Sequence, residues 1–441
     1  MSRAAPGPRR GRARPPPMRV EITSLAPGGE GVGHVEWGGR RRAVFVRASA
    51  PGDVVEAEFE ADETPLRASR VLRLLAEGPG RRAPACAHAE RCGGCAWGHL
   101  TPERRAAARV ELVSATVLRA LGSPPGLEVV DHPAPSEERY RTRARLAARG
   151  GARPLVGYRP FRGGGVVDVG SCLVLDRRLE PVVGLLREAL GGSRGEGEAR
   201  AALGAGGAPT FELAWSGELA PRFFERIERL VGEGRLAGAA LRLEGARAPV
   251  VVGDPRVLTE GPDGLPLEVP SGGFAQANPA VTGLLAGHLR AALEPAGKRL
   301  VELYAGAGTL SVALAPGAAD YVAVESDAAA LEAARRNFAA RALKVRTRVA
   351  DAASYPLDAR PDGVVLDPPR AGAAALVPRL VGARPREVMY VSCDPVTLAR
   401  DAAALAGAGY TAESLHTFDM FPQTDHVEAA LHLVRRAGAR R

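Results

Sequence analysis

From Ser271 onward, the chain alternates short apolar runs with longer amphipathic stretches. The runs have the length of buried strands, and the intervening stretches have the length of helices. The strand candidates are Arg299–Tyr304, Tyr321–Val324, Lys344–Val349, Gly363–Leu366 and Glu387–Val391. Repeated strand–helix units are typical of a doubly wound parallel sheet, so the sequence predicts an α/β, Rossmann-like domain over residues 266–441. Two last runs, Leu415–Phe418 and Val427–Leu433, predict a pair of strands that close the sheet.

Glycines and carboxylates follow these predicted strands. The glycines of Ala305–Gly308 let the backbone turn tightly and approach a ligand closely. Glu325 ends the second strand, where a carboxylate accepts from ribose hydroxyls, and Asp351 ends the third, where it suits an adenine amino group. Ser311 stands three residues after Gly308, so the glycine pattern of dinucleotide sites is incomplete. This favours S-adenosylmethionine over NAD; the alternative is a sheet with acidic strand ends and no ligand.

Cys393 lies just after the fifth predicted strand, and Pro395 opens an amphipathic helix over Val396–Leu405. Ligands of open α/β sheets bind beyond the carboxyl ends of the strands, so this thiol is well placed for chemistry. The partial positive charge of the helix N-terminus is expected to favour the thiolate. The alternative is a buried core cysteine.

The segment Phe274–Pro279 precedes an apolar helix. Asn278 is predicted to cap this helix, with Pro279 at its first position. Gln276 has no such structural explanation, and we expect its side-chain amide to bind substrate at the mouth of the pocket.

The chain has 441 residues, a formal charge of +9 and five cysteines. This length allows two or three domains, and a positive balance is expected of a protein that meets phosphate backbones. The N-terminus lacks the apolar core of a signal peptide, and no stretch is long and apolar enough to span a bilayer. We therefore expect a cytoplasmic protein without a membrane partner, in which clustered cysteines indicate a metal rather than disulfides.

Four of the cysteines form a candidate metal site. Cys86, Cys92 and Cys95 have the spacing C-x5-C-x2-C, and Cys172 follows later in the chain. Four thiolates suit an iron–sulfur cluster or an all-cysteine zinc site, and the spacing does not choose between them. The spacing is not C-x3-C-x2-C, which disfavours radical chemistry on S-adenosylmethionine.

The first 77 residues divide into a tail and a small barrel. Residues 1–17 are rich in Arg, Pro and Gly, which predicts a disordered basic tail. Over residues 18–77, short runs separated by glycine and proline turns predict a barrel of about five strands. The runs are Val20–Ile22, Gly33–Trp37, Ala43–Val46 and Val54–Phe59.

Residues 78–265 contain the cysteines, a predicted helix over Thr101–Ala120 and a run of arginines. In a strand over Arg139–Leu146, alternation places four arginines on one face. Like charges repel unless anions meet them, so we interpret this face as phosphate-facing, with a solvated strand edge as the alternative. The arginines are Arg139, Arg141, Arg143 and Arg145, and Arg159 extends the surface. Residues Gly191–Pro209, rich in Gly and Ala, predict a mobile insertion.

Together these features resemble the TRAM-domain, iron–sulfur family of RNA (uracil-5-)-methyltransferases, over about Arg19 to Arg435. The barrel is similar to a TRAM domain, an OB-like RNA-binding module, and the four cysteines are similar to the family's [4Fe–4S] ligands. Five segments match catalytic-domain motifs: Phe274–Asn278, Tyr304–Gly308, Asp367–Gly372, Ser392–Pro395 and His426–Glu428.

The resemblance implies methylation of uridine C5 in RNA, with 23S rRNA favoured over tRNA, by a monomer that uses S-adenosylmethionine and a [4Fe–4S] cluster. It assigns Cys393 as the nucleophile and Glu428 as the base. Gln276, Tyr304, Glu325 and Asp367 would line the cofactor and base pocket, together with Gly306, Gly308 and Asp351. Two other classes remain as alternatives: an iron–sulfur oxidoreductase that uses a nucleotide, and a non-catalytic RNA-binding protein.

Overall fold

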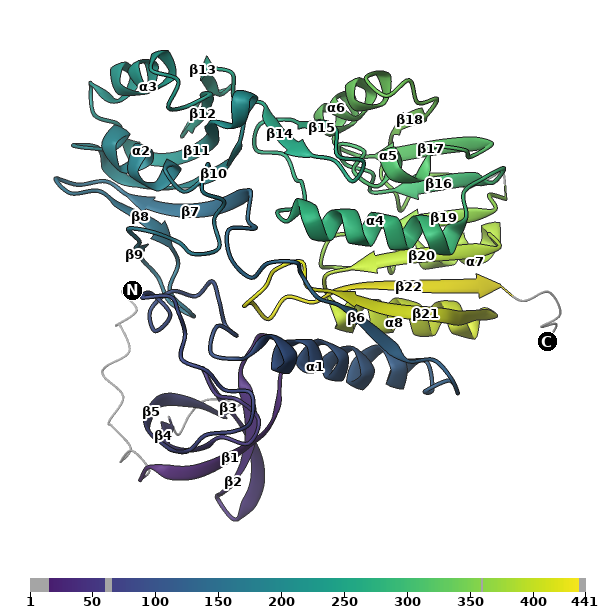
Figure 1. Ribbon diagram of the computed structural model, residues 1–441, viewed down its shortest axis with the longest axis horizontal. Coiled ribbons are helices and arrows are strands. Elements are labelled where there is room, and N and C mark those ends of the chain that lie inside the picture. Colours follow the sequence, from purple (N-terminus) through teal and green to yellow (C-terminus); the bar gives the residue numbers. More distant parts are fainter. Residues whose placement is uncertain (1–15, 60–65, 358–359, 436–441) are drawn as a thin grey trace, which may run out of the picture. The chain divides into compact units, whose positions relative to one another are not determined.

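The computed structural model describes residues 16–59, 66–357 and 360–435 (Figure 1). The predicted basic tail, residues 1–17, lies almost wholly outside this part of the chain. The chain divides into two compact units. The smaller takes the chain up to Ala85 with Cys95–Ala108 and Gln423–Asp425, and the larger takes Cys86–Gly94, Arg109–Pro422 and the chain from His426 onward. Among the described residues, no helix combines the length and the apolar character needed to cross a membrane.

A closed five-stranded barrel makes up most of the smaller unit. Its strands are β1 (Met18–Leu25), β2 (Gly31–Trp37), β3 (Arg40–Val46), β4 (Val54–Phe59) and β5 (Leu66–Ala76). They join in the order β1-β2-β3-β5-β4, and alternate residues such as Val20 and Ile22 form the core with Phe59. The prediction of a barrel of about five strands is therefore confirmed.

The larger unit contains a seven-stranded sheet in the order β13-β12-β11-β10-β7-β8-β9, with helices α2 and α3 packed on it. Its elements are β7 (Arg143–Arg149), β8 (Leu155–Tyr158), β9 (Val167–Asp168), α2 (Val182–Ala189), β10 (Arg194–Leu203), β11 (Pro209–Glu218), α3 (Phe223–Gly232), β12 (Gly238–Leu243) and β13 (Val250–Gly253). A hairpin of β14 (Val257–Glu260) and β15 (Pro266–Val269) follows. The predicted helix over Thr101–Ala120 is α1 (Pro102–Val113), continued by a π-helical turn over Ser114–Leu118.

The prediction of a mobile insertion over Gly191–Pro209 is wrong. β10 fills most of this segment and pairs with β11 along its whole length and with β7 along most of it. Ala199, Ala201 and Leu203 alternate into the core. The glycine and alanine content hid this strand, because a strand paired on both sides beneath closely packed helices does not need large side chains.

A second sheet in the larger unit has eight strands in the order β18-β17-β16-β19-β20-β22-β21-β6. The parallel strands are β16 (Arg299–Leu303), β17 (Asp320–Glu325), β18 (Arg346–Val349), β19 (Gly363–Leu366) and β20 (Glu387–Ser392). β22 (Glu428–Arg435) runs antiparallel to both β20 and β21 (Tyr410–Phe418). The predicted parallel sheet and its closing pair are confirmed. β6 (Val129–His132), which the sequence did not predict, adds an edge strand parallel to β21.

Helices cover both faces of this sheet (Figure 1). α4 (Pro279–Leu293) and α5 (Ser311–Leu314) share a core with alternate strand residues such as Met389 and Val391, and α6 (Ala328–Ala339) packs with Ala323 of β17 in a second core. Tyr390 points the other way and donates to Asp401 of α8 (Pro395–Gly407) over 2.7 Å. α8 and its neighbour α7 (Val377–Ala383) therefore lie on the opposite face.

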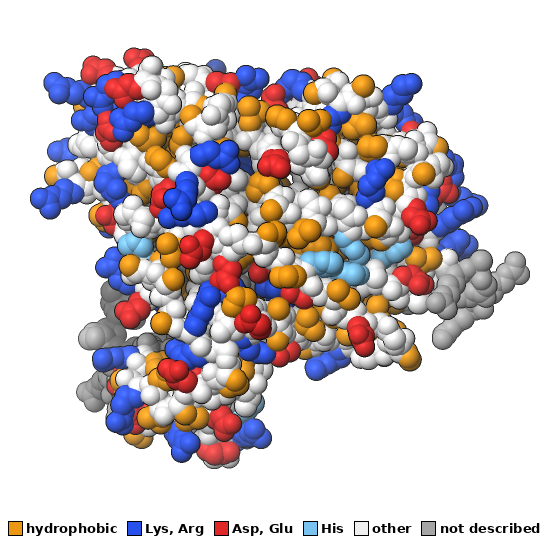
Figure 2. All heavy atoms as spheres, viewed as in Figure 1, with side chains coloured by type: hydrophobic (Ala, Val, Ile, Leu, Met, Phe, Trp, Pro, Cys, Tyr) orange, Lys and Arg blue, Asp and Glu red, His pale blue; other side chains and the backbone are white. Residues whose placement is uncertain are grey.

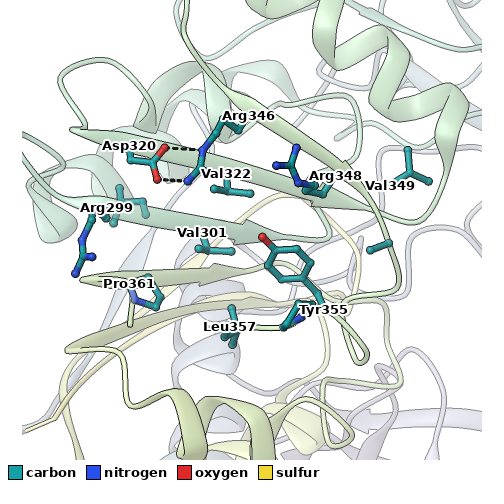
Figure 3. A pocket seen from close by; sticks show the side chains of 13 residues that line it. Arg299, Val301, Asp320, Val322, Arg346, Arg348, Val349, Tyr355, Leu357 and Pro361 are labelled. Carbon is teal, nitrogen blue, oxygen red and sulfur yellow. Dashed lines mark hydrogen bonds and ion pairs between the residues drawn. The ribbon is translucent and has the colours of Figure 1, made fainter. Parts of the chain in front are cut away.

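Part of that second face is hollow. The described residues between β18 and β19 form no helix, and a cavity of about 440 Å³ is lined there by Val301, Val322 and Tyr355 (Figure 3). Arg346 and Asp320 form an ion pair along its wall. Because Asp320 begins β17, the cavity reaches the amino ends of the strands, away from the edge that carries the candidate site.

Candidate active site

The carboxyl edge of the eight-stranded sheet collects the predicted site residues. Tyr304 follows β16, Glu325 ends β17, Asp351 lies just beyond β18, Asp367 follows β19 and Cys393 follows β20. β22 runs in the opposite direction, so its first residue, Glu428, lies at the same edge. Segments that are far apart in the sequence therefore meet where ligands of such sheets bind.

The loop after β16 has the backbone shape of a close-approach turn. Tyr304, Gly306 and Gly308 have φ angles of 65°, 54° and 84°. A Cβ on Gly308 would lie 2.6 Å from the Phe338 ring of α6, so glycine is needed for this packing. A Cβ on Gly306 would meet nothing within 4 Å, so this glycine borders open space. The loop thus combines strained backbone with room for a ligand.

Two carboxylates lie close to this loop. Glu325 accepts from the backbone N–H of Gly306 at 3.0 Å. Burial, followed by the charges of Asp351, Asp401 and Glu325, raises the pKa of Tyr304, which places Tyr304 within electrostatic reach of these groups. A carboxylate has about four lone-pair sites, so Glu325 and Asp351 can also accept from ligand hydroxyl or amino groups.

Cys393 and Glu428 are brought together by the register of β20 and β22. Ser392 pairs with Ala429 in the antiparallel ladder. One step further along this register, Cys393 stands opposite Glu428, and opposed side chains point to the same face. The charge of Glu428 is, after burial, the main cause that raises the pKa of Cys393. The sequence shows that both residues are present, but the strand register that brings them together is visible only in the fold.

A second carboxyl group joins this pair. Asp367 accepts a hydrogen bond from the Gln276 side chain, and burial raises the pKa of Asp367 to about 7. Burial and then the charge of Asp367 raise the pKa of Glu428 well above the ordinary glutamate value. Two buried carboxylates this close repel each other, so ionisation of one makes ionisation of the other less favourable.

The prediction that the helix N-terminus favours the Cys393 thiolate is wrong for this state of the protein. Burial and then Glu428 raise the pKa of Cys393 to about 11, although Arg370 acts to lower it. The start of α8 is occupied by Asp394, whose carboxylate accepts from two backbone N–H groups of the helix at 2.9 and 3.0 Å. The helix end is thus neutralised by its own cap, and the thiol is the resting form.

We expect alkylation of Cys393 by iodoacetamide to be slow at pH 7 and to accelerate about tenfold per pH unit up to pH 9, because only the thiolate reacts. Mass spectrometry of the Cys393 peptide, without RNA or cofactor, measures this rate. An ordinary thiol with a pKa of about 8.5 would instead level off near pH 9. A plateau at or below that pH would contradict the raised pKa.

Arg370 is a site residue for which the sequence analysis predicted no role of its own. Its Nη2 lies 2.9 Å from Nδ1 of His426, and its charge lowers the pKa of Cys393. Arg370 and His426 belong to loops after different strands, so only the folded sheet shows that they meet.

The segment that carries Gln276 is held by the start of β7. Thr142 donates its backbone N–H and its hydroxyl to the carbonyl oxygen of Ala277 at 2.9 and 3.2 Å. Arg143 donates to the carbonyl oxygen of Gly273. These contacts join residues more than 100 positions apart in the sequence, where no local pattern indicates them.

Asn278 caps α4 as predicted. Its side-chain oxygen accepts from Val281 N at 3.4 Å, and its amide group donates to the carbonyl oxygen of Met420 at 3.3 Å. The cap therefore also ties the start of α4 to the chain beyond β21.

The four arginines do not form one strand face. β7 begins at Arg143, so Arg139 and Arg141 precede the strand, and Arg139 has a φ of 57°. Arg139 pairs with Glu180 at 2.7 Å, and Arg145 pairs with a glutamate of β10. Glutamates from distant segments thus neutralise two of the arginine charges that the sequence pattern predicted to face phosphates.

The cysteines lie in both units: Cys86, Cys92 and Cys172 belong to the larger and Cys95 to the smaller. None of the five cysteines forms a disulfide. Donors face three of the sulfurs: His88 N–H to Cys86 and Gly94 N–H to Cys92, both at 3.4 Å, and Tyr158 O–H to Cys172 at 3.7 Å. Hydrogen bonds of this kind are also found at thiolates that ligate a metal.

The sheet is an open, mostly parallel α/β sheet with the antiparallel strand β22 inserted between β20 and β21. The glycine loop and the carboxylates after the following strands lie where that fold holds its cofactor. The fold and the site therefore define a Rossmann-like, nucleotide-binding domain.

Comparison with known proteins identifies the family. The model for tRNA (Uracil-5-)-methyltransferase matches residues 345–436, and the model for the methyltransferase small domain matches residues 271–383. The chain is 33% identical over 456 residues to the 23S rRNA (uracil(1939)-C(5))-methyltransferase RlmD of Alkalilimnicola ehrlichii, with 98% of this chain and 99% of that protein covered. It is 34% identical over 445 residues to RlmD of Halomonas elongata, with 95% and 90% covered.

A solved structure shares the fold over the same length. The crystal structure of Pyrococcus abyssi tRNA (uracil-54, C5)-methyltransferase in complex with S-adenosyl-L-homocysteine superposes with a TM-score of 0.75 at 24% identity, covering 95% of this chain and 99% of that one. With the relatives above, these findings show that the chain belongs to the RNA (uracil-5-)-methyltransferase family.

Proposed function

We propose that this protein transfers a methyl group from S-adenosylmethionine to C5 of a uridine in 23S rRNA. The observation that carries the proposal is the meeting of Cys393 and Glu428 at the sheet edge that also holds the glycine loop. A nucleophilic sulfur beside a carboxyl group is the pair that this reaction needs. The RlmD relatives, which match nearly the whole chain, favour ribosomal RNA over tRNA.

The reaction begins at Cys393. C5 of uracil is a poor nucleophile until a thiolate adds to C6. When the Cys393 sulfur bonds to C6, the electrons of the C5–C6 double bond move toward O4, and C5 gains enolate character. S-adenosylmethionine supplies an electrophilic methyl group on a sulfonium cation, a positive charge that also favours the thiolate.

Glu428 completes the reaction. After C5 has taken the methyl group, the Glu428 carboxylate removes the C5 proton, the C5–C6 double bond re-forms, and the bond from C6 to Cys393 breaks with release of the thiolate. The raised pKa of Glu428 makes its carboxylate a stronger base than an exposed glutamate. Activity should therefore require a pH at which this group is ionised.

Asp367 and Gln276 orient the uracil ring. As a carboxylate, Asp367 only accepts hydrogen bonds, so N3–H is its natural donor on the base. The bond from Gln276 fixes the Asp367 carboxyl group. The target uridine must leave its stack to reach this edge of the sheet.

The cofactor would be held by the loop after β16 and by the carboxylates beyond it. Gly306 borders the open space, Glu325 is oriented by the backbone of that loop, and Asp351 lies close by. We assign Glu325 to the ribose hydroxyls and Asp351 to the adenine amino group.

The proposed function is tested with the full-length protein, labelled S-adenosylmethionine, and unmodified transcripts of 23S rRNA and of tRNA. We expect one methyl group per 23S rRNA molecule, mapped as 5-methyluridine at a single position, and none in tRNA. Methylation of tRNA alone would establish the tRNA alternative instead. Reduction of the cluster by NAD(P)H without methylation would support the oxidoreductase alternative. RNA binding without any methylated product would support the non-catalytic RNA-binding alternative.

We also propose that Cys86, Cys92, Cys95 and Cys172 hold a [4Fe–4S] cluster. Donors to three of the sulfurs support the proposal, and Cys95 is assigned from the spacing of the motif alone. No step of the methyl transfer needs the cluster, so we assign it a structural role, with zinc as the alternative metal.

Cys172→Ser is expected to lower the iron content from about four per chain to less than half of that, since one of four ligands is lost. Anaerobic purification followed by iron and sulfide analysis measures this. Cys393→Ser is the matched control and should keep its iron. Zinc in place of iron in the wild-type protein, or unchanged iron in Cys172→Ser, would contradict the assignment.

Contacts to the RNA backbone are proposed for the barrel and for the arginine surface. Arg159 is exposed and donates a hydrogen bond of 3.2 Å to the carbonyl oxygen of Gly165. Arg141 lies 5.8 Å from the centre of the Phe421 ring. Arg139, Arg143 and Arg145 each donate at least one hydrogen bond to a partner within the protein. We take the protein to act as a monomer on one RNA site, which sedimentation of the complex would check.

A further inference from the structure

Three histidines from separate elements converge on the larger unit, and no step of the proposed reaction uses them. His132 lies on the edge strand β6, His288 on α4 and His416 on β21. Figure 2 shows histidine side chains gathered at the surface between α4 and β6. All three residues of the cluster are partly exposed.

The ring nitrogens of the cluster are close enough to share one ion. One nitrogen from each ring can be chosen so that all three lie within 4.8 Å of one another. His132 Nε2 is 2.9 Å from His416 Nδ1, and the ring centres of His288 and His416 are 3.9 Å apart. Nitrogens that bind zinc at about 2.0–2.1 Å stand roughly 3.3 Å apart, so small ring movements suffice.

The local folding that builds the cluster follows from the sheet register. In the parallel pair of β21 and β6, Phe418 stands beside His132, and their rings stack at 4.5 Å. His416 precedes Phe418 by two residues, so both point to the same face, which α4 covers. On α4, His288 lies at the border between the buried face, which carries Leu285 and Leu289, and the face toward solvent.

One polar atom in this cluster has no partner among the described residues. Nε2 of His288 is buried and accepts or donates no hydrogen bond there. An unsatisfied buried nitrogen is costly, and the bond between His132 and His416 does not relieve it. The nearby Asp131 is occupied, because Arg109 bonds both of its oxygens at 2.7 and 2.8 Å.

We propose that His132, His288 and His416 form a binding site for a divalent transition-metal ion of the zinc class. Imidazole nitrogen is a preferred ligand for such ions. Three protein ligands leave a position for water. The ion would join the edge strand β6 to its neighbour β21 and to α4. β6 and α4 are far apart in the sequence.

The test uses the full-length, iron-loaded protein with one equivalent of zinc, so that the proposed cysteine site is already filled. We expect one tightly bound zinc per chain after desalting, with K-edge absorption showing nitrogen neighbours at about 2.0–2.1 Å rather than sulfur at about 2.3 Å. Zinc should also raise the melting temperature.

Two variants separate metal binding from folding. His288→Gln, on the part-exposed side of α4, and His416→Gln should each weaken zinc binding by more than about 100-fold, since loss of a ligand exceeds loss of a second-sphere contact. His34→Gln, at an exposed position of β2, is the control and should bind like the wild type. A sulfur shell in the wild type, or unchanged zinc binding and melting response in both cluster variants, would overturn the proposal.

Discussion

Cys393→Ala is expected to lower the rate of uridine methylation by more than about 10,000-fold, because C5 of the uracil ring is not activated without a nucleophile at C6. The affinity for RNA should change by less than about twofold, since one small side chain supplies little of an RNA interface. Single-turnover transfer of labelled methyl groups measures the first quantity, and filter binding measures the second.

Cys393→Ser separates nucleophilicity from shape. Serine keeps the size and polarity of the side chain, but its hydroxyl ionises far less readily than a thiol, so we expect this variant to be as inactive as Cys393→Ala. A serine or alanine variant that retains more than a few per cent of wild-type activity would show that another group attacks C6.

The carboxyl-edge residues could be predicted from the sequence because a parallel sheet is simple in one respect. Every apolar run ends at the same edge, so the polar residues that follow the runs, such as Glu325, Asp367 and Cys393, must gather there. The boundaries also followed from local signals: the predicted Gly363–Leu366 run is β19 itself, and Asn278 caps α4. Resemblance to a family added Glu428, which lies on a strand of opposite direction.

The parts that could not be predicted depend on partners far away in the chain. β6 is short and part-exposed, and it is a strand only because β21 offers its edge. Arg139 and Arg145 looked available for phosphate because Glu180 and β10 are not adjacent to them in sequence. The pKa of Cys393 likewise depends on burial and on Glu428, and these oppose the effect that a helix N-terminus has on an isolated thiol.

Glu428→Gln is expected to trap the RNA on the protein. Under the proposed mechanism, glutamine leaves the attack of Cys393 and the methyl transfer intact but cannot take the C5 proton, so the bond between sulfur and C6 persists. A complex that survives denaturing electrophoresis should appear with S-adenosylmethionine present, while turnover falls by more than about 100-fold. The double variant Cys393→Ala with Glu428→Gln is the control and should form no such complex.

The stability of Glu428→Gln makes this result interpretable. Because folding raises the pKa of Glu428, the folded state holds this proton more tightly than the unfolded state does. The free energy of unfolding of the wild type therefore falls as the pH rises from about 4.3, the pKa of an unfolded glutamate, to the pKa of Glu428 in the folded state. Glutamine cannot ionise, so the variant should melt at a higher temperature than the wild type at pH 8 and at a similar temperature near pH 4. A variant that melts higher and binds RNA but forms no adduct would place the base elsewhere, since misfolding would then be excluded as the cause.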